Sequence, residues 1–91
     1  MEITDLRAGI DAIDAELIAL FEKRMDVSAQ IAAYKRERGL PVLDSAREAE
    51  KLADVAARCR PETSPYIPGI FRAVMAASRA YQTALTEERH E

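Results

Sequence analysis

The 91-residue sequence contains one cysteine, one histidine and no tryptophan, and each scarcity excludes a class of protein. A single thiol, Cys59, cannot form an internal disulfide, and Cys59 with His90 is too little for a metal-binding cluster. Two phenylalanines and three tyrosines leave leucine, isoleucine, valine and alanine to build the core. We therefore expect neither a disulfide framework nor a metal site.

The sequence also lacks a basic surplus and a long apolar run. Its net charge of −3 argues against general nucleic-acid binding, which usually shows an excess of lysine and arginine. No stretch reaches about 18 apolar residues, and no basic segment followed by an apolar one opens the chain, so we expect no membrane span and a cytoplasmic location. With 48% apolar and 32% charged residues, the composition is typical of one soluble domain, residues 1–91.

What the sequence does contain is helical periodicity, interrupted at two places by proline and glycine. The first helix is expected over about 5–37, with Thr4 or Asp5 as its cap and Gly39 and Pro41 at its end. The second and third are expected over about 45–59 and 65–86. The second helix is expected to begin at Asp44 or Ser45 as a cap, with Ser45 and Glu48 as a capping box. The third is expected to begin at Ser64, the cap that precedes Pro65. The pattern predicts an all-α, three-helix protomer without strands.

The first helix is too long for a small globular monomer. Thirty residues span about 45 Å, whereas a compact chain of this size has a radius of gyration of about 12 Å. A partner must cover its apolar seam, and we therefore expect an intertwined homodimeric helical bundle. The seam positions are Leu6, Ile10, Ile13, Leu17, Leu20, Val27, Ile31 and Tyr34.

Polar residues interrupt this seam and the apolar stripe of the third helix. Arg24 occupies a position where the rhythm requires an apolar residue, and Lys35, eleven residues later, returns to within about 20° of the same direction. On the third helix, Ser78 continues the stripe and Gln82 follows one turn later. Near the start of the second helix lie the charged residues Asp44, Arg47 and Glu48.

Each of these residues also has a purely structural interpretation. A seam arginine can set helix register, a lysine near a helix end can complement the dipole, and Glu48 can act as a cap. However, burying two cations without partners is costly, and the seam offers few carboxylates. The set as a whole favours a site for a small dianion between helices. Arg7, about 25 Å and roughly 100° away from Arg24, reaches that site only from an antiparallel partner.

Nearly the whole chain, from Leu6 to Gln82, resembles the all-helical class of chorismate mutases. The resemblance rests on the segments "LRAGIDAIDAELIALFEKRMDVSAQIAAYK", "PVLDSAREAE" and "YIPGIFRAVMAASRAYQ" and on their order. It implies a dimer formed through the long first helices, with two equivalent sites. It also implies the Claisen rearrangement of chorismate to prephenate on the route to phenylalanine and tyrosine, without a cofactor.

The resemblance further implies a role for each site residue. Arg24, and Arg7 from the partner subunit, would bind the two substrate carboxylates, and Lys35 and Gln82 would donate to the ether oxygen. Glu48 would hold the ring hydroxyl. Asp44, Arg47 and Ser78 match supporting positions. Arg79 departs from the family, which commonly has an aliphatic residue there, and from the periodicity we expect it to turn outward.

Residue chemistry is consistent with such a reaction, because a pericyclic rearrangement needs no nucleophile or metal. It needs cations that hold the reactive conformer and donors for the oxygen of the breaking bond. Two alternatives remain at this point: the related isochorismate pyruvate lyase, and a non-catalytic helical dimerisation or regulatory module. A partner enzyme of the shikimate pathway is a further expectation.

Overall fold

The computed structural model describes residues 2–88, and His90 lies outside the described residues. It contains three helices: α1, Ile3–Glu37; α2, Ser45–Arg58; and α3, Ile67–Glu88. Residues 2–88 form no strand, and the all-α prediction is confirmed.

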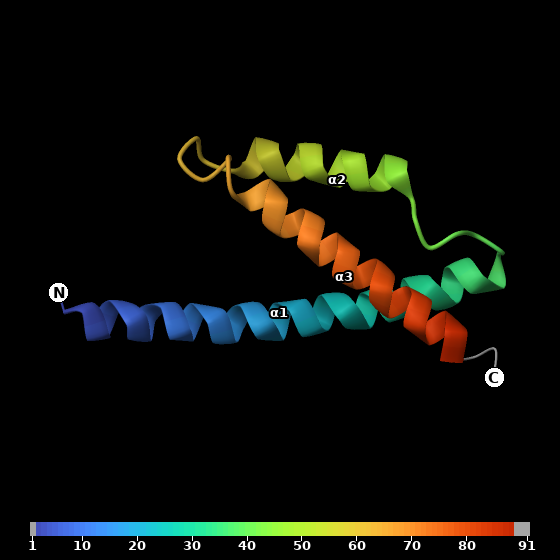
Figure 1. The fold of residues 1–91 in the computed structure, drawn as a ribbon, viewed down its shortest axis with the longest axis horizontal. Coiled ribbons are helices and arrows are strands. Elements are labelled where there is room, and N and C mark those ends of the chain that lie inside the picture. The colour runs from blue at the N-terminus through green and yellow to red at the C-terminus, as the bar shows by residue number, and fades with distance from the viewer. Residues whose placement is uncertain (1, 89–91) are drawn as a thin grey trace.

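The third helix holds the protomer together. α3 packs against both α1 and α2, whereas α1 and α2 have no close backbone contact with each other. In Figure 1, α3 runs obliquely from the end of α2 to the C-terminal part of α1, and the N-terminal half of α1 extends beyond the other helices. α3 therefore connects the C-terminal part of α1 with α2.

α1 begins earlier than expected and ends at a glycine motif. Its cap is Glu2, without a side-chain hydrogen bond, so the prediction of Thr4 or Asp5 as the cap is wrong. Asp5 lies in the first turn, where its charge complements the helix dipole. At the other end, Gly39 has φ +65°, and the Leu40 N–H donates to the Lys35 carbonyl at 2.8 Å. This Schellman-type ending turns the chain back toward α2.

Replacing Gly39 by alanine should lower the free energy of unfolding by about 1–2 kcal/mol, because a Cβ disfavours the left-handed conformation. Gly69→Ala is the matched control. Gly69 lies inside α3, where a Cβ added to it would have nothing within 4 Å, and alanine there should be neutral or stabilising. Urea unfolding of both variants measures the difference. Equal midpoints would contradict the assigned role of Gly39.

The second helix is capped by one residue that the sequence identified. The Asp44 side chain accepts a hydrogen bond from the Arg47 N–H at 3.0 Å, which confirms Asp44 as the cap. The expected capping box between Ser45 and Glu48 is wrong, because the Glu48 carboxylate pairs with Arg79 on α3. A contact between helices has replaced the local one.

The third helix begins two residues later than expected. Residues 61–66 form turns, and the Thr63 carbonyl accepts from the Ile67 N–H at 3.2 Å. The Ser64 hydroxyl donates to the Pro61 carbonyl at 3.3 Å instead of capping α3. Pro68 is the second residue of the helix, where a missing N–H costs little.

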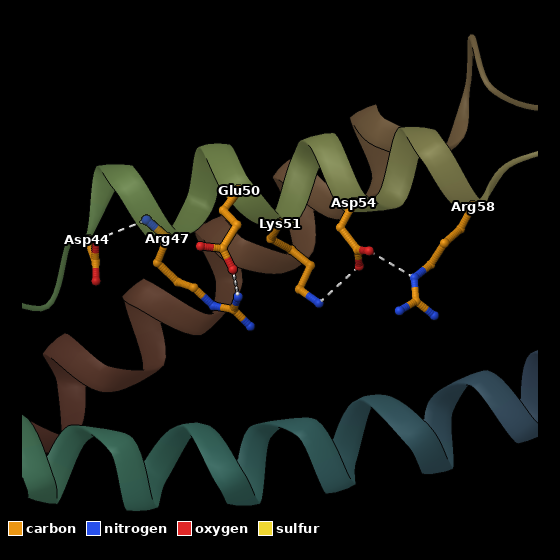
Figure 2. A network of polar contacts seen from close by, with 6 residues as sticks. All are labelled: Asp44, Arg47, Glu50, Lys51, Asp54 and Arg58. Atoms are coloured by element: carbon orange, nitrogen blue, oxygen red, sulfur yellow. Dashed lines mark hydrogen bonds and ion pairs between the residues drawn. The ribbon is translucent and has the colours of Figure 1, made fainter.

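Figure 2 shows a row of ion pairs along the side of α2 that faces α1. Arg47 pairs with Glu50 at 2.6 Å, and Asp54 pairs with Lys51 at 3.6 Å and with Arg58 at 3.0 Å. The hydrogen bond from Arg58 holds the pKa of Asp54 below its ordinary value. Arg47 and Lys51 therefore each form an ion pair with a carboxylate of the same helix.

The protomer buries few apolar side chains and has a large accessible surface for its mass. Among residues 2–88, the buried apolar residues are Ala32, Val55 and Met75, each 6% exposed. The radius of gyration is 16.5 Å, and the accessible surface is 7117 Å². A compact monomer of 10.1 kDa would expose about 5,300 Å². In the N-terminal part of α1, up to residue 20, seven large apolar side chains are between 42% and 59% exposed: Ile3, Leu6, Ile10, Ile13, Leu17, Ile18 and Leu20.

Candidate active site

A cavity of about 620 Å³ lies among α1, α3, the N-terminal half of α2 and the link between α1 and α2. Its lining includes seven of the eight residues singled out from the sequence: Arg24, Lys35, Asp44, Arg47, Glu48, Ser78 and Gln82. Arg7 is not among the lining residues of its own chain. Residues that the sequence singled out in three separate segments therefore surround one cavity.

A chain of hydrogen bonds crosses from α1 to α3 along one wall. Arg24 Nη1 donates to Ser78 Oγ at 3.0 Å, and Ser78 Oγ lies 2.9 Å from Ser28 Oγ. Gln82 Nε2 donates to Ser28 Oγ at 2.8 Å. Ser28, Ser78 and Gln82 are buried, so these bonds fix the arginine and the amide relative to each other.

The amide of Gln82 has one unsatisfied end. Within residues 2–88, the buried Oε1 atom has no hydrogen-bond partner. A half-turn of the amide would let Oε1 accept from the Ser28 hydroxyl and would free the NH₂ group. Gln82 can therefore present a donor to an acceptor oxygen in the cavity while Ser28 satisfies its other end.

Ser28 is a functional candidate that sequence reasoning missed. It is 3% exposed and contacts both Ser78 and Gln82. The signal was present, because Ser28 lies one turn after Arg24 and two turns before Lys35 on the same face. Lys51, one turn after Arg47, also lines the cavity and was missed.

Lys35 reaches the cavity from the last turn of α1. Its Nζ atom donates to the Val42 carbonyl at 2.7 Å, and the chain reversal at Gly39 brings that carbonyl back toward the helix. An ammonium group has three donors, so two remain for a ligand. The link between α1 and α2 thus positions Lys35.

The charges around the cavity are not balanced. Among the residues that the structure describes, neither Arg24 nor Lys35 forms an ion pair with a carboxylate. Arg47 and Lys51, in contrast, are paired within α2. Two half-buried, unpaired cations on one wall would be stabilised by an anionic ligand.

Arg79 lies in the cavity wall, so the expectation that it turns outward is wrong. Its guanidinium group pairs with Glu48 across the boundary between α3 and α2. The helix is rotated so that Ser78 and Gln82 face α1, and this rotation brings Arg79 toward α2. Arg79 therefore pairs with the carboxylate that the family resemblance assigned to a ring hydroxyl.

The rest of the wall is apolar. Its side chains come from α1, α3 and the link: Val27, Ile31, Tyr34, Leu40, Val42 and Met75. Residues 2–88 hold no cluster of metal-ligating side chains, and no helix among them is long and apolar enough to cross a membrane. Fold and cavity together define a class: an all-helical protein with a cavity lined by unpaired cations and by apolar side chains.

Comparison with known proteins places the chain within that class. Residues 6–83 match the family chorismate mutase type II, and the chain belongs to this family. Its structure is similar to a crystal structure of chorismate mutase from Helicobacter pylori in complex with prephenate. The TM-score is 0.85 at 32% identity, and the match covers 94% of each chain.

Two curated relatives are similar over shorter segments. The T-protein of Haemophilus influenzae is 44% identical over 46 residues, which are 50% of this chain and 12% of that protein. The 4-amino-4-deoxychorismate mutase of Streptomyces venezuelae is 37% identical over 46 residues, 50% of this chain and 45% of that protein. The chain therefore spans a small part of the T-protein.

Proposed function

We propose that this protein converts chorismate to prephenate. The observation that carries the proposal is a pair of cations, Arg24 and Lys35, that have no carboxylate partner among residues 2–88 and line a cavity that also presents the Gln82 amide. Chorismate has two carboxylates on a small apolar frame, and its reaction breaks a carbon–oxygen ether bond. The membership of the chorismate mutase type II family supports the same reaction.

The site residues act by binding and by stabilising charge. Arg24 clamps one carboxylate and keeps the enolpyruvyl arm folded over the ring, which removes much of the entropic barrier. Lys35 and Gln82 donate to the ether oxygen, where negative charge develops as the bond breaks. The ring hydroxyl donates to Glu48. Ser78 holds Arg24, while Asp44 and Arg47 stabilise the start of α2 behind Glu48.

The decisive experiment follows the loss of chorismate absorbance with purified protein and identifies the product by acid conversion of prephenate to phenylpyruvate. We expect saturable turnover with prephenate as the product. Pyruvate release from isochorismate, without chorismate turnover, would favour the lyase alternative. A folded protein that neither binds nor converts either compound would favour the non-catalytic alternative.

Replacing Ser28 by alanine should lower kcat/KM for chorismate about 3–10-fold. The loss corresponds to one buried hydrogen bond, about 0.5–1.5 kcal/mol, because the Gln82 amide is then held less firmly. Ser45→Ala, at an exposed position on α2, is the control. The Ser28→Ala substitution removes the hydrogen bonds to both Ser78 and Gln82. Unchanged kinetics in this variant would show that the Gln82 amide does not need the Ser28 hydroxyl to hold it.

We further propose that the protein is a homodimer built on α1. The protomer exposes about 1,800 Å² more than a compact monomer of its mass, so a dimer covering this surplus buries about 3,600 Å² in total. That area is in the range of obligate homodimers. An antiparallel α1 of the partner subunit would bring Arg7 to the second substrate carboxylate. A partner enzyme of the shikimate pathway and a cytoplasmic location remain predictions from the sequence.

A further inference from the structure

The contact between Arg79 and Glu48 gives the cavity a feature that the proposed reaction does not require. Glu48 lies in the first turn of α2 and Arg79 on α3, and their side chains line the cavity while pairing with each other. Their side chains are 25% and 35% exposed, so the pair is only partly screened by solvent. Any group of a ligand that approaches Glu48 therefore also approaches a fixed positive charge.

This arrangement affects neutral and charged ring substituents differently. A hydroxyl group can donate to the Glu48 carboxylate while Arg79 keeps its own hydrogen bond, because a carboxylate has about four acceptor sites. An ammonium group at the same ring carbon would have to share Glu48 with the guanidinium group. Aliphatic amines are positively charged at pH 7, so the two like charges would repel each other at short range.

We propose that Arg79 is a specificity-determining residue that selects a neutral hydroxyl group over an ammonium group on the substrate ring. The proposal rests on the function proposed above and deepens it, because it assigns the class of ring substituent that the Glu48 end of the cavity accepts. Arg79 acts through Glu48 and does not need to touch the reacting atoms. The pair 4-amino-4-deoxychorismate and chorismate differs in this one substituent and is the natural probe.

A merely structural role for Arg79 makes a different prediction. If the ion pair only tied α2 to α3, its removal would weaken the fold or lower kcat/KM for both substrates by the same factor. A specificity role predicts that the ratio of the two kcat/KM values changes. The ratio is therefore the quantity to measure, because a general loss of activity cancels in it.

The test measures kcat/KM for both compounds at pH 7 with the wild-type protein, Arg79→Leu and Arg79→Lys. We expect Arg79→Leu to raise the ratio of amino to hydroxy substrate about tenfold or more, since Glu48 is then free to pair with the ammonium group. Arg79→Lys retains the charge and should stay within about threefold of the wild type. Arg72→Leu is the matched control, because Arg72 is exposed on α3 and does not line the cavity.

Glu48→Gln gives an independent test with the opposite sign. Without its carboxylate, the cavity keeps the Arg79 charge unbalanced, and the ratio should fall below the wild-type value. If Arg79→Leu melts too early to assay, Arg79→Gln removes the charge while keeping a polar side chain of similar length. An unchanged ratio in a folded, charge-free variant at position 79 would overturn the proposal.

Failure of the proposed function is distinguishable from failure of this inference. A wild-type protein that converts neither compound contradicts the proposed reaction alone. In that case the same ratio is measured as Kd by titration calorimetry, which needs no turnover. Weaker binding of the amino compound, relieved in Arg79→Leu, would still support the selectivity, and equal binding in both proteins would overturn it.

Discussion

Replacing Lys35 by alanine is expected to lower kcat/KM for chorismate at least about 100-fold. Loss of one donor to a developing oxyanion in a site of this kind typically costs about 10²–10³ in rate. Lys35 is also one of two cavity cations without a carboxylate partner among residues 2–88, so its charge is available to the ligand. Steady-state kinetics on chorismate measure the loss.

Two controls separate catalysis from folding. Lys35→Ala also removes the 2.7 Å hydrogen bond to the Val42 carbonyl, so helicity and molar mass must be measured alongside activity. We expect both to match the wild type. Lys23→Ala removes a charge from an exposed position of the same helix and should retain activity. Near-normal turnover in Lys35→Ala would show that the cavity does not use this ammonium group.

Mixing Arg7→Ala with Arg24→Ala should restore activity that neither variant has alone. Each variant is expected to lose about 100-fold or more, because each lacks one of the two carboxylate clamps. In an antiparallel dimer, each site takes Arg24 from one subunit and Arg7 from the other. A mixed dimer therefore contains one intact site and one site that lacks both arginines.

The expected recovery is quantitative. Random exchange of subunits yields half mixed dimers, each with one of two sites intact, so activity should approach about one quarter of the wild-type value per subunit. Light scattering should give twice 10.1 kDa for each variant and for the mixture. Two differently tagged variants establish that exchange has occurred. Mixed dimers without activity would argue that each site is built from a single chain.

The sequence identified most of the polar residues that line the cavity, because helical periodicity preserves direction over long distances. Arg24 and Lys35 were predicted to share a face, and both line the cavity. Ser78 and Gln82 likewise lie one turn apart and are both buried. Their predicted catalytic roles remain to be tested by the variants described above.

The predictions of helix caps that were wrong have a common cause. The side chains form other contacts in place of the local ones that the sequence pattern indicated. Ser45 and Glu48 have the spacing of a capping box, but Glu48 pairs with Arg79, more than thirty residues away in the chain. Ser64 has the position of a cap, yet it bonds within the turn that precedes α3. A pattern in one segment carries no information on which distant side chain will compete for the same group.

Packing within the protomer also differs from the apolar rhythm. Val27, Ile31 and Tyr34 continue the seam, but they line the cavity and remain exposed, whereas Ser28 and Ala32 are the buried residues of α1. Small side chains allow α3 to approach α1 closely, so the contact follows residue size and not hydrophobicity alone. The apolar rhythm therefore does not indicate that Ser28 is buried, although Ser28 lies one helical turn after Arg24.

The sequence by itself determined three helices, their approximate lengths, and a set of polar residues on helix faces that should be apolar. These properties depend on local backbone preferences and on a period of 3.6 residues, which a linear pattern contains. Only the tertiary structure decided that α3 crosses between α1 and α2, that Ser28 supports Gln82, and that Arg79 faces Glu48. Those outcomes depend on the rotation of each helix about its own axis relative to its neighbours. Side-chain volumes determine that rotation only when all three helices pack together.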